Sequence, residues 1–163
     1  MAYPNWPLLE ADNLSVTFPV SGGFWREKKV VHAVNQVTVH IYPGEMLGLV
    51  GESGSGKSTL GRALLQLERV AAGEVRFDGQ RITHGLTSDI VRLRQQSAMI
   101  FQDPFASLNP RQTVGESIAE VLRVHQKVPR AQVTQRVAEL LTQVGLRTQQ
   151  ASAKPSQLSG GQC

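Results

Sequence analysis

The sequence predicts an α/β fold whose 163 residues run from a β-rich start through an α/β centre to an all-helical end. Three observations predict it: β-branched residues alternate early in the chain, an apolar run enters a glycine-rich loop, and helical periodicity dominates after residue 113. We expect an antiparallel β subdomain over about 7–45, an α/β core over about 46–102 and a helical subdomain over about 103–163.

Two strands are expected first. Apolar residues alternate from Leu14 to Phe18 within residues 9–20, which indicates a strand with one buried face. Residues 21–29 are expected to form a loop, and residues 30–41 a second strand, because β-branched residues are abundant there.

Two short apolar runs, at 46–50 and 97–101, are typical of strands that are buried on both faces in a parallel sheet. Between them, residues 73–82 are expected to form a hairpin that turns at the Asp-Gly pair, 78–79.

Helical spacing follows the glycine-rich loop and returns near the end of the chain. We expect helices over 113–125 and 131–144, with Gly145 just beyond the second, where helices commonly end on glycine. The helix expected directly after the glycine-rich loop places four apolar residues on one face: Leu60, Ala63, Leu64 and Leu67.

The composition excludes several classes. No segment approaches the ~18 consecutive apolar residues that span a bilayer, and the N-terminus lacks the pattern of a secretory signal. Cys163 is the only cysteine, so no internal disulfide is expected and the cytosol is the expected compartment. The net charge of +4 is dispersed along the chain, which favours an ordinary solvated surface over a nucleic-acid site.

Residues 51–58 match the phosphate-loop pattern G-x-x-x-x-G-K-[ST] without a mismatch. Gly54 and Gly56 permit backbone angles and a close approach that a Cβ would block, so consecutive amides can face a phosphate. The alternative is a Gly/Ser-rich surface loop, but a strand before the motif and a helix after it favour nucleotide binding. The predicted binding residues are Gly51, Ser53, Gly54, Ser55, Gly56, Lys57, Ser58 and Thr59.

Three of these residues have distinct expected roles. Lys57 presents a compact positive charge to the β- and γ-phosphates, and the hydroxyl of Ser58 is expected to bind Mg²⁺. Thr59 is placed to bond the α-phosphate.

Two further motifs narrow the prediction to a family. Residues 158–162 (LSGGQ) resemble the signature motif of ABC ATPases, and Gln102, after the 97–101 run, resembles their Q-loop glutamine. Residues 101–111 and 114–123 resemble the ATP subunits of oligopeptide, dipeptide and glutathione importers. The ATP subunits of importers for other solutes, such as nickel, share much of this sequence and remain an alternative.

The resemblance implies a P-loop NTPase of the ABC type, with ATP and Mg²⁺ as its ligands. Gln102 would contact Mg²⁺ and the attacking water. Gln102 and Lys57 are the expected catalytic residues. Phe18 would stack on adenine, and the alternative is that it is an aromatic residue of the core.

The resemblance also implies partners. Two ATPase subunits would pair head to tail, with each signature motif closing the nucleotide of the other subunit. Transmembrane permease subunits and, indirectly, a solute-binding protein would complete an importer on the inner face of the cell membrane. The residues acting across the dimer would be Ser159, Gly160, Gly161 and Gln162.

The sequence also departs from the family. Cys163 stands where an arginine is usual, and the strand ending in Asp-Glu and the switch histidine of the family are not among the 163 residues. Asp103 is not that Asp, because Gln102 precedes it and no acidic residue follows. We therefore expect a domain that is incomplete at its C-terminus, with negligible hydrolysis and marginal folding when isolated.

Two alternatives remain, the first from these departures and the second from the sequence pI near 9.6. One is a non-catalytic nucleotide-binding fragment, which would bind ATP without turning it over. The other is an ABC-type ATPase that acts on nucleic acid, but the coiled-coil or zinc insertion typical of that class is absent from the sequence.

Overall fold

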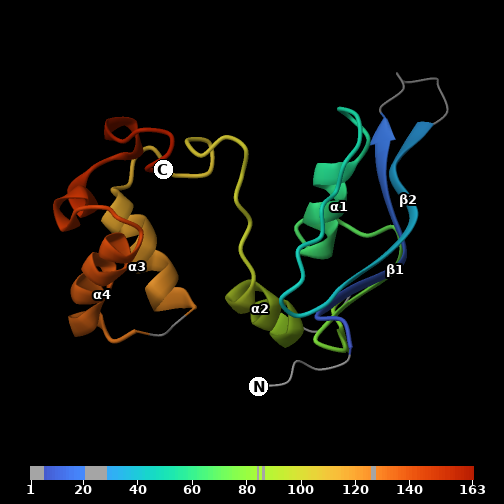
Figure 1. Ribbon diagram of the computed structural model, residues 1–163, viewed down its shortest axis with the longest axis horizontal. Helices are drawn as coiled ribbons and strands as arrows, with labels where there is room; N and C mark the ends of the chain where they lie inside the picture. Colours follow the sequence, from blue (N-terminus) through green and yellow to red (C-terminus); the bar gives the residue numbers. More distant parts are fainter. Residues whose placement is uncertain (1–5, 21–28, 84, 86, 126–127) are drawn as a thin grey trace. The chain divides into compact units, whose positions relative to one another are not determined.

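The structure is a computed structural model, and it describes every residue except 1–5, 21–28, 84, 86 and 126–127 (Figure 1). The chain divides into two compact units, Met1–Ser97 and Ala98–Cys163. Each unit contains its own cluster of buried apolar side chains.

A four-stranded antiparallel sheet organises the first unit, with the strand order β2-β1-β3-β4. The two long strands and the hairpin predicted from the sequence are confirmed. The hairpin turns at Asp78 and Gly79, both with positive φ, as a tight two-residue turn requires. The predicted loop over 21–29 lies outside the described residues apart from its last residue. The strands are β1 (Leu9–Val20), β2 (Lys29–Ile41), β3 (Ala72–Phe77) and β4 (Gln80–Arg81).

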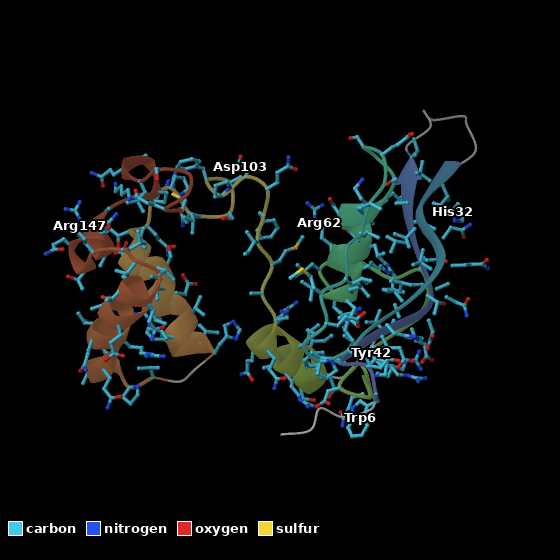
Figure 2. The ribbon with its side chains drawn as sticks, in the orientation of Figure 1. Trp6, His32, Tyr42, Arg62, Asp103 and Arg147 are labelled. Atoms are coloured by element: carbon cyan, nitrogen blue, oxygen red, sulfur yellow. The ribbon has the colours of Figure 1, made fainter. Side chains whose placement is uncertain are left out.

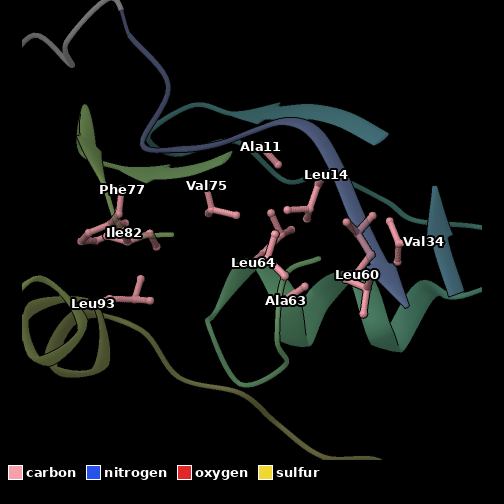
Figure 3. Close-up of a cluster of buried hydrophobic side chains, with 12 residues drawn as sticks. Ala11, Leu14, Val34, Leu60, Ala63, Leu64, Val75, Phe77, Ile82 and Leu93 are labelled. Atoms are coloured by element: carbon pink, nitrogen blue, oxygen red, sulfur yellow. The ribbon is translucent and has the colours of Figure 1, made fainter. Parts of the chain in front are cut away.

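Helix α1 (Lys57–Leu64) packs on the sheet and supplies the centre of the first core. Its buried side chains, Leu60, Ala63 and Leu64, face Leu14 and other apolar residues of the strands (Figure 3). Burying a leucine of this kind contributes roughly 1.5–3 kcal/mol relative to leaving it exposed. This contact fixes the start of α1, and therefore the loop before it, against the sheet.

Helix α2 (Thr87–Gln96) was not anticipated from the sequence. It contributes Leu93, which is fully buried (Figure 3). The partly buried Ile90 packs on the same core. The spacing of these two residues, with Asp89 in the first turn and Arg94 in the last, is the signal that could have indicated a helix.

The prediction of strands at 46–50 and 97–101 is wrong: neither segment forms regular secondary structure. Met46 and Val50 are 96% and 91% exposed, and Ile100 is 96% exposed. A strand buried on both faces is stable only when neighbouring strands supply its hydrogen bonds and cover its side chains. No strand in the described part of the chain pairs with either segment.

The second unit is helical, and both helices predicted there are confirmed. Leu122 of α3 packs with three side chains of α4 to form the second core. Gly145 has a φ of 76° just after the second helix, as expected of a glycine at a helix end. Two short 3₁₀ helices were not predicted. The elements are α3 (Val114–Val124), α4 (Arg130–Gln143), η1 (Thr148–Ser152) and η2 (Pro155–Gln157).

Within the described residues, none of the helices combines the length and the apolar character that crossing a membrane requires.

Candidate functional site

The glycine-rich loop lies directly against β2. Gly54 and Gly56 have φ values of 81° and 91°, in the left-handed region that favours glycine. A Cβ on Gly56 would lie 2.1 Å from the carbonyl oxygen of Ala33. Gly56 is therefore required both by its backbone conformation and by this close approach, whereas the space around Gly54 is open.

Helix α1 begins at the end of this loop and has an uncapped N-terminus. Gly56 is its N-cap, with no side-chain cap, and the first turn contains no acidic residue. The amide of Leu60 donates to the carbonyl oxygen of Gly56 at 2.8 Å. The amides of Lys57, Ser58 and Thr59 precede that first intrahelical bond, so they have no carbonyl partner within the helix and lie at its positive end. This arrangement suits an anion such as a phosphate.

The ammonium group of Lys57 folds back onto the loop. It donates to the carbonyl oxygens of Gly51 at 2.8 Å and Glu52 at 2.5 Å, and to the hydroxyl of Ser55 at 3.2 Å. The amide of Ser55 donates to the carbonyl oxygen of Glu52 at 3.2 Å, which closes the turn. These bonds hold a positive charge beside the loop amides, where a phosphate would need it.

The two hydroxyl residues that follow Lys57 differ in exposure: Ser58 is exposed, whereas Thr59 is half-buried. A hydroxyl at the position of Ser58 is an oxygen ligand of the kind that Mg²⁺ prefers. The donor set of this loop therefore fits a magnesium–nucleotide complex.

Phe18 lies at the same end of the sheet as the loop. It pairs with Val31 across β1 and β2, two residues from Ala33, which touches the loop at Gly56. Phe18 is half-buried and packs against the first core. Its expected role as an adenine platform stays a prediction, because this packing is also what the alternative, a core aromatic, requires.

Gln102 and Asp103 belong to the second unit, and both are exposed. The carboxylate of Asp103 accepts hydrogen bonds from the amides of Phe105 at 3.0 Å and Ala106 at 3.2 Å. Asp103 therefore shapes the turn after Gln102.

Residues 159–162 form a reciprocal cap. The amide of Ser159 donates to the side-chain oxygen of Gln162 at 3.0 Å, and the amide of Gln162 donates to the hydroxyl of Ser159 at 3.3 Å. This is the hydrogen-bond pattern of a capping box, here on the turn at 160–162, and the Ser-x-x-Gln spacing would have predicted it. Within the described chain, the amides of Gly160 and Gly161 have no acceptor, so they are available to a partner.

Phe105 is a neighbour of the signature motif that sequence reasoning missed. Its ring edge lies 3.7 Å from where a Cβ on Gly160 would be. The turn after Gln102 and the signature motif are therefore in contact within the second unit. The P-loop and Phe18 belong to the first unit, so the joint action predicted for Lys57 and Gln102 stays a prediction.

Comparison with known families shows to which family these motifs belong. The family model described as ABC transporter matches residues 34–163, most of the chain. The chain belongs to the ABC transporter family. The match includes the loop, Gln102 and the signature motif.

The ABC chain is similar to glutathione import ATP-binding proteins named GsiA. It is 50% identical to that of Escherichia coli K12 and 49% identical to that of Pectobacterium atrosepticum, each over 157 residues. These alignments cover 96% of this chain and 25% of each relative, so the chain spans about a quarter of the length of the ATP-binding proteins it matches.

A solved structure shares the fold. The ATP-binding cassette MJ0796, a dimer in a post-hydrolysis state bound to ADP and Pi, matches with a TM-score of 0.78 at 27% identity. The alignment covers 94% of this chain and 64% of the cassette. The predicted ABC ATPase fold is therefore confirmed, as a partial domain with an antiparallel sheet and a helical unit.

Proposed function

We propose that this chain binds ATP with Mg²⁺ as part of the energy-coupling subunit of an ABC importer. One observation carries the proposal: the ammonium group of Lys57 is bonded to the loop beside the open N-terminus of α1. That combination places a cation and uncapped amides where a chain of phosphates can be bound.

Each group of the loop has a place in this proposal. The amides around Gly54 and Gly56 surround the phosphates, and Lys57 neutralises the β- and γ-phosphates. Ser58 binds Mg²⁺, which supplies charge neutralisation when bound. Phe18, at the same end of the sheet, stacks on the adenine ring.

We propose that the second unit acts on the nucleotide of a second subunit. Its uncapped amides at Gly160 and Gly161, beside Ser159 and Gln162, suit contact with a γ-phosphate. Gln102 would orient water and Mg²⁺. The dimeric state of the cassette MJ0796 supports a paired arrangement.

The identity to glutathione importers favours glutathione or short peptides as the imported solutes. We therefore propose transmembrane permease subunits as direct partners and a solute-binding protein as an indirect one, with the chain at the inner face of the membrane. Import of another solute, such as nickel, is the alternative.

Nucleotide binding is tested by titrating Mg²⁺ and a fluorescent ATP analogue into the full chain. Replacing Lys57 by Ala should weaken binding by roughly 10–100-fold, since hydrogen bonds to charged groups contribute about 1.5–3 kcal/mol. Lys154→Ala, at an exposed lysine in the second unit, is the matched control and should change affinity less than about twofold. Equal affinities of wild type and Lys57→Ala would overturn the proposal.

Transport is tested with a chimera. The 157 matched residues replace their counterparts in the Escherichia coli relative, and uptake of labelled glutathione, a dipeptide and Ni²⁺ is measured in cells lacking that relative. We expect the chimera to import glutathione or the dipeptide, and we expect Lys57→Ala to abolish this uptake. A chimera that binds ATP but supports no glutathione uptake would contradict the proposed role in energising an importer.

A further inference from the structure

The outer face of the sheet holds a group of metal-ligand side chains that the nucleotide site does not use. Glu10 and Asp12 of β1 and His40 of β2 each offer one ligand atom, and the three atoms lie within 4.8 Å of one another. The His40 Nε2 atom is 3.6 Å from a carboxylate oxygen of Asp12. The group lies at the start of β1, whereas Phe18 lies near its end.

The register of the sheet places these side chains together. Glu10 is the direct partner of His40 across the β1–β2 pair. Asp12 follows two positions after Glu10, on the same face, since side chains alternate along a strand. Ala11, between them, points the other way and is fully buried in the core. Two hydrogen-bonded strands therefore hold the three ligands, with little backbone freedom to lose on binding.

The ligand set indicates which ions would bind. One imidazole nitrogen with two carboxylate oxygens suits borderline divalent transition metals such as Zn²⁺, whereas Mg²⁺ and Ca²⁺ prefer oxygen ligands alone. The side chains of Glu10, Asp12 and His40 are 21%, 40% and 41% exposed, so an ion from solution can reach them. We propose that Glu10, Asp12 and His40 form a divalent transition-metal site on the β sheet.

The charges around the group are compatible with a dication. A guanidinium nitrogen of Arg76 lies 3.5 Å from Glu10, and Arg76 also pairs with Glu74 at 3.0 Å. Arg81 pairs with Glu74 at 3.4 Å. The three carboxylates exceed the two guanidinium groups by one negative charge, which a bound metal ion would offset. The competing interpretation is an ion-pair network that binds no metal.

The test titrates Zn²⁺ into tag-free full chain and follows heat release and the melting temperature. Zn²⁺ should bind one-to-one and raise the melting temperature of the wild type. His40→Ala should weaken binding at least about tenfold. The control is His32→Ala, at an exposed histidine on the same strand (Figure 2) that lies outside the group, and it should keep the wild-type affinity.

A second measurement separates a built site from loose surface binding. Co²⁺ replaces Zn²⁺, and its visible absorption band reports nitrogen and oxygen ligation. The band should be lost in His40→Ala and in the isosteric Asp12→Asn, and both variants should still bind the ATP analogue, which shows that they fold. No Zn²⁺ binding, or equal affinity in wild type and His40→Ala, would leave the ion-pair network alone and overturn the proposal.

Discussion

The backbone of Gly56 approaches β2 so closely that a Cβ there would lie 2.1 Å from the carbonyl oxygen of Ala33. Gly56 also has a φ of 91°, so a side chain at this position is disfavoured both by the backbone conformation and by the close approach of Ala33. Gly56→Ala must therefore displace the phosphate loop from the strand, because a carbonyl oxygen of the backbone cannot rotate away as a side chain can.

We expect Gly56→Ala to abolish binding of the ATP analogue and to lower the free energy of unfolding by more than about 1 kcal/mol. Gly48→Ala is the control, since Gly48 lacks the positive φ and a Cβ added there would meet no atom within 4 Å. Wild-type nucleotide affinity in Gly56→Ala would show that the contact with Ala33 does not shape the loop.

At Gly61, inside α1, we expect a substitution by alanine to raise stability instead of lowering it. A Cβ there meets nothing within 4 Å, and its φ is not positive. Gly61→Ala should stabilise the protein by about 0.5–1 kcal/mol, because alanine is the better helix former. Thermal unfolding measures the change, and nucleotide affinity should stay the same. A loss of stability would mean that the exposed side of α1 is covered by something other than solvent.

Thr113 caps helix α3, with its hydroxyl accepting from the amide of Glu116 at 3.2 Å. Thr113→Ala leaves that amide without its partner and should destabilise the protein by about 1 kcal/mol. Thr113→Ser keeps the hydroxyl and should recover most of the loss. The midpoint of urea unfolding distinguishes the two variants, and equal midpoints would argue against the cap.

Glu116 completes the capping box and predicts a dependence on pH. Hydrogen bonds from the backbone and then the side chain of Thr113 lower the pKa of Glu116 below its ordinary value of 4.5. A carboxyl whose pKa is lower when folded stabilises the fold above the unfolded pKa. That contribution is lost as the pH falls through the lower, folded value. Stability measured from pH 6 down to pH 3 should therefore decline less steeply in Glu116→Gln than in the wild type.

Leu122 tests whether the two cores are separate. It is 1% exposed and packs with other residues of the second unit. Leu122→Ala should cost about 2–5 kcal/mol and should release hydrogen-exchange protection in α3 and α4 first. Affinity for the ATP analogue should change little, since the P-loop rests on the other core. Equal loss of protection in β1 would show one cooperative core instead.

The sequence by itself determined the elements whose cause is local. The alternation within β1 and β2, the Asp-Gly turn at 78–79 and the apolar face of α4 could all be predicted, because each depends on neighbours a few residues away. The P-loop was readable for the same reason, since its glycines and Lys57 are contiguous.

Tertiary structure decided what depends on distant partners. The 46–50 and 97–101 segments have the composition of buried strands, yet they are exposed, because a strand needs neighbours that composition cannot supply. The contact of Gly56 with Ala33 and the convergence of Glu10 with His40 likewise depend on strand register. Glu10 and His40 are thirty residues apart in the chain, so their pairing forms only when β1 and β2 come together in the folded sheet.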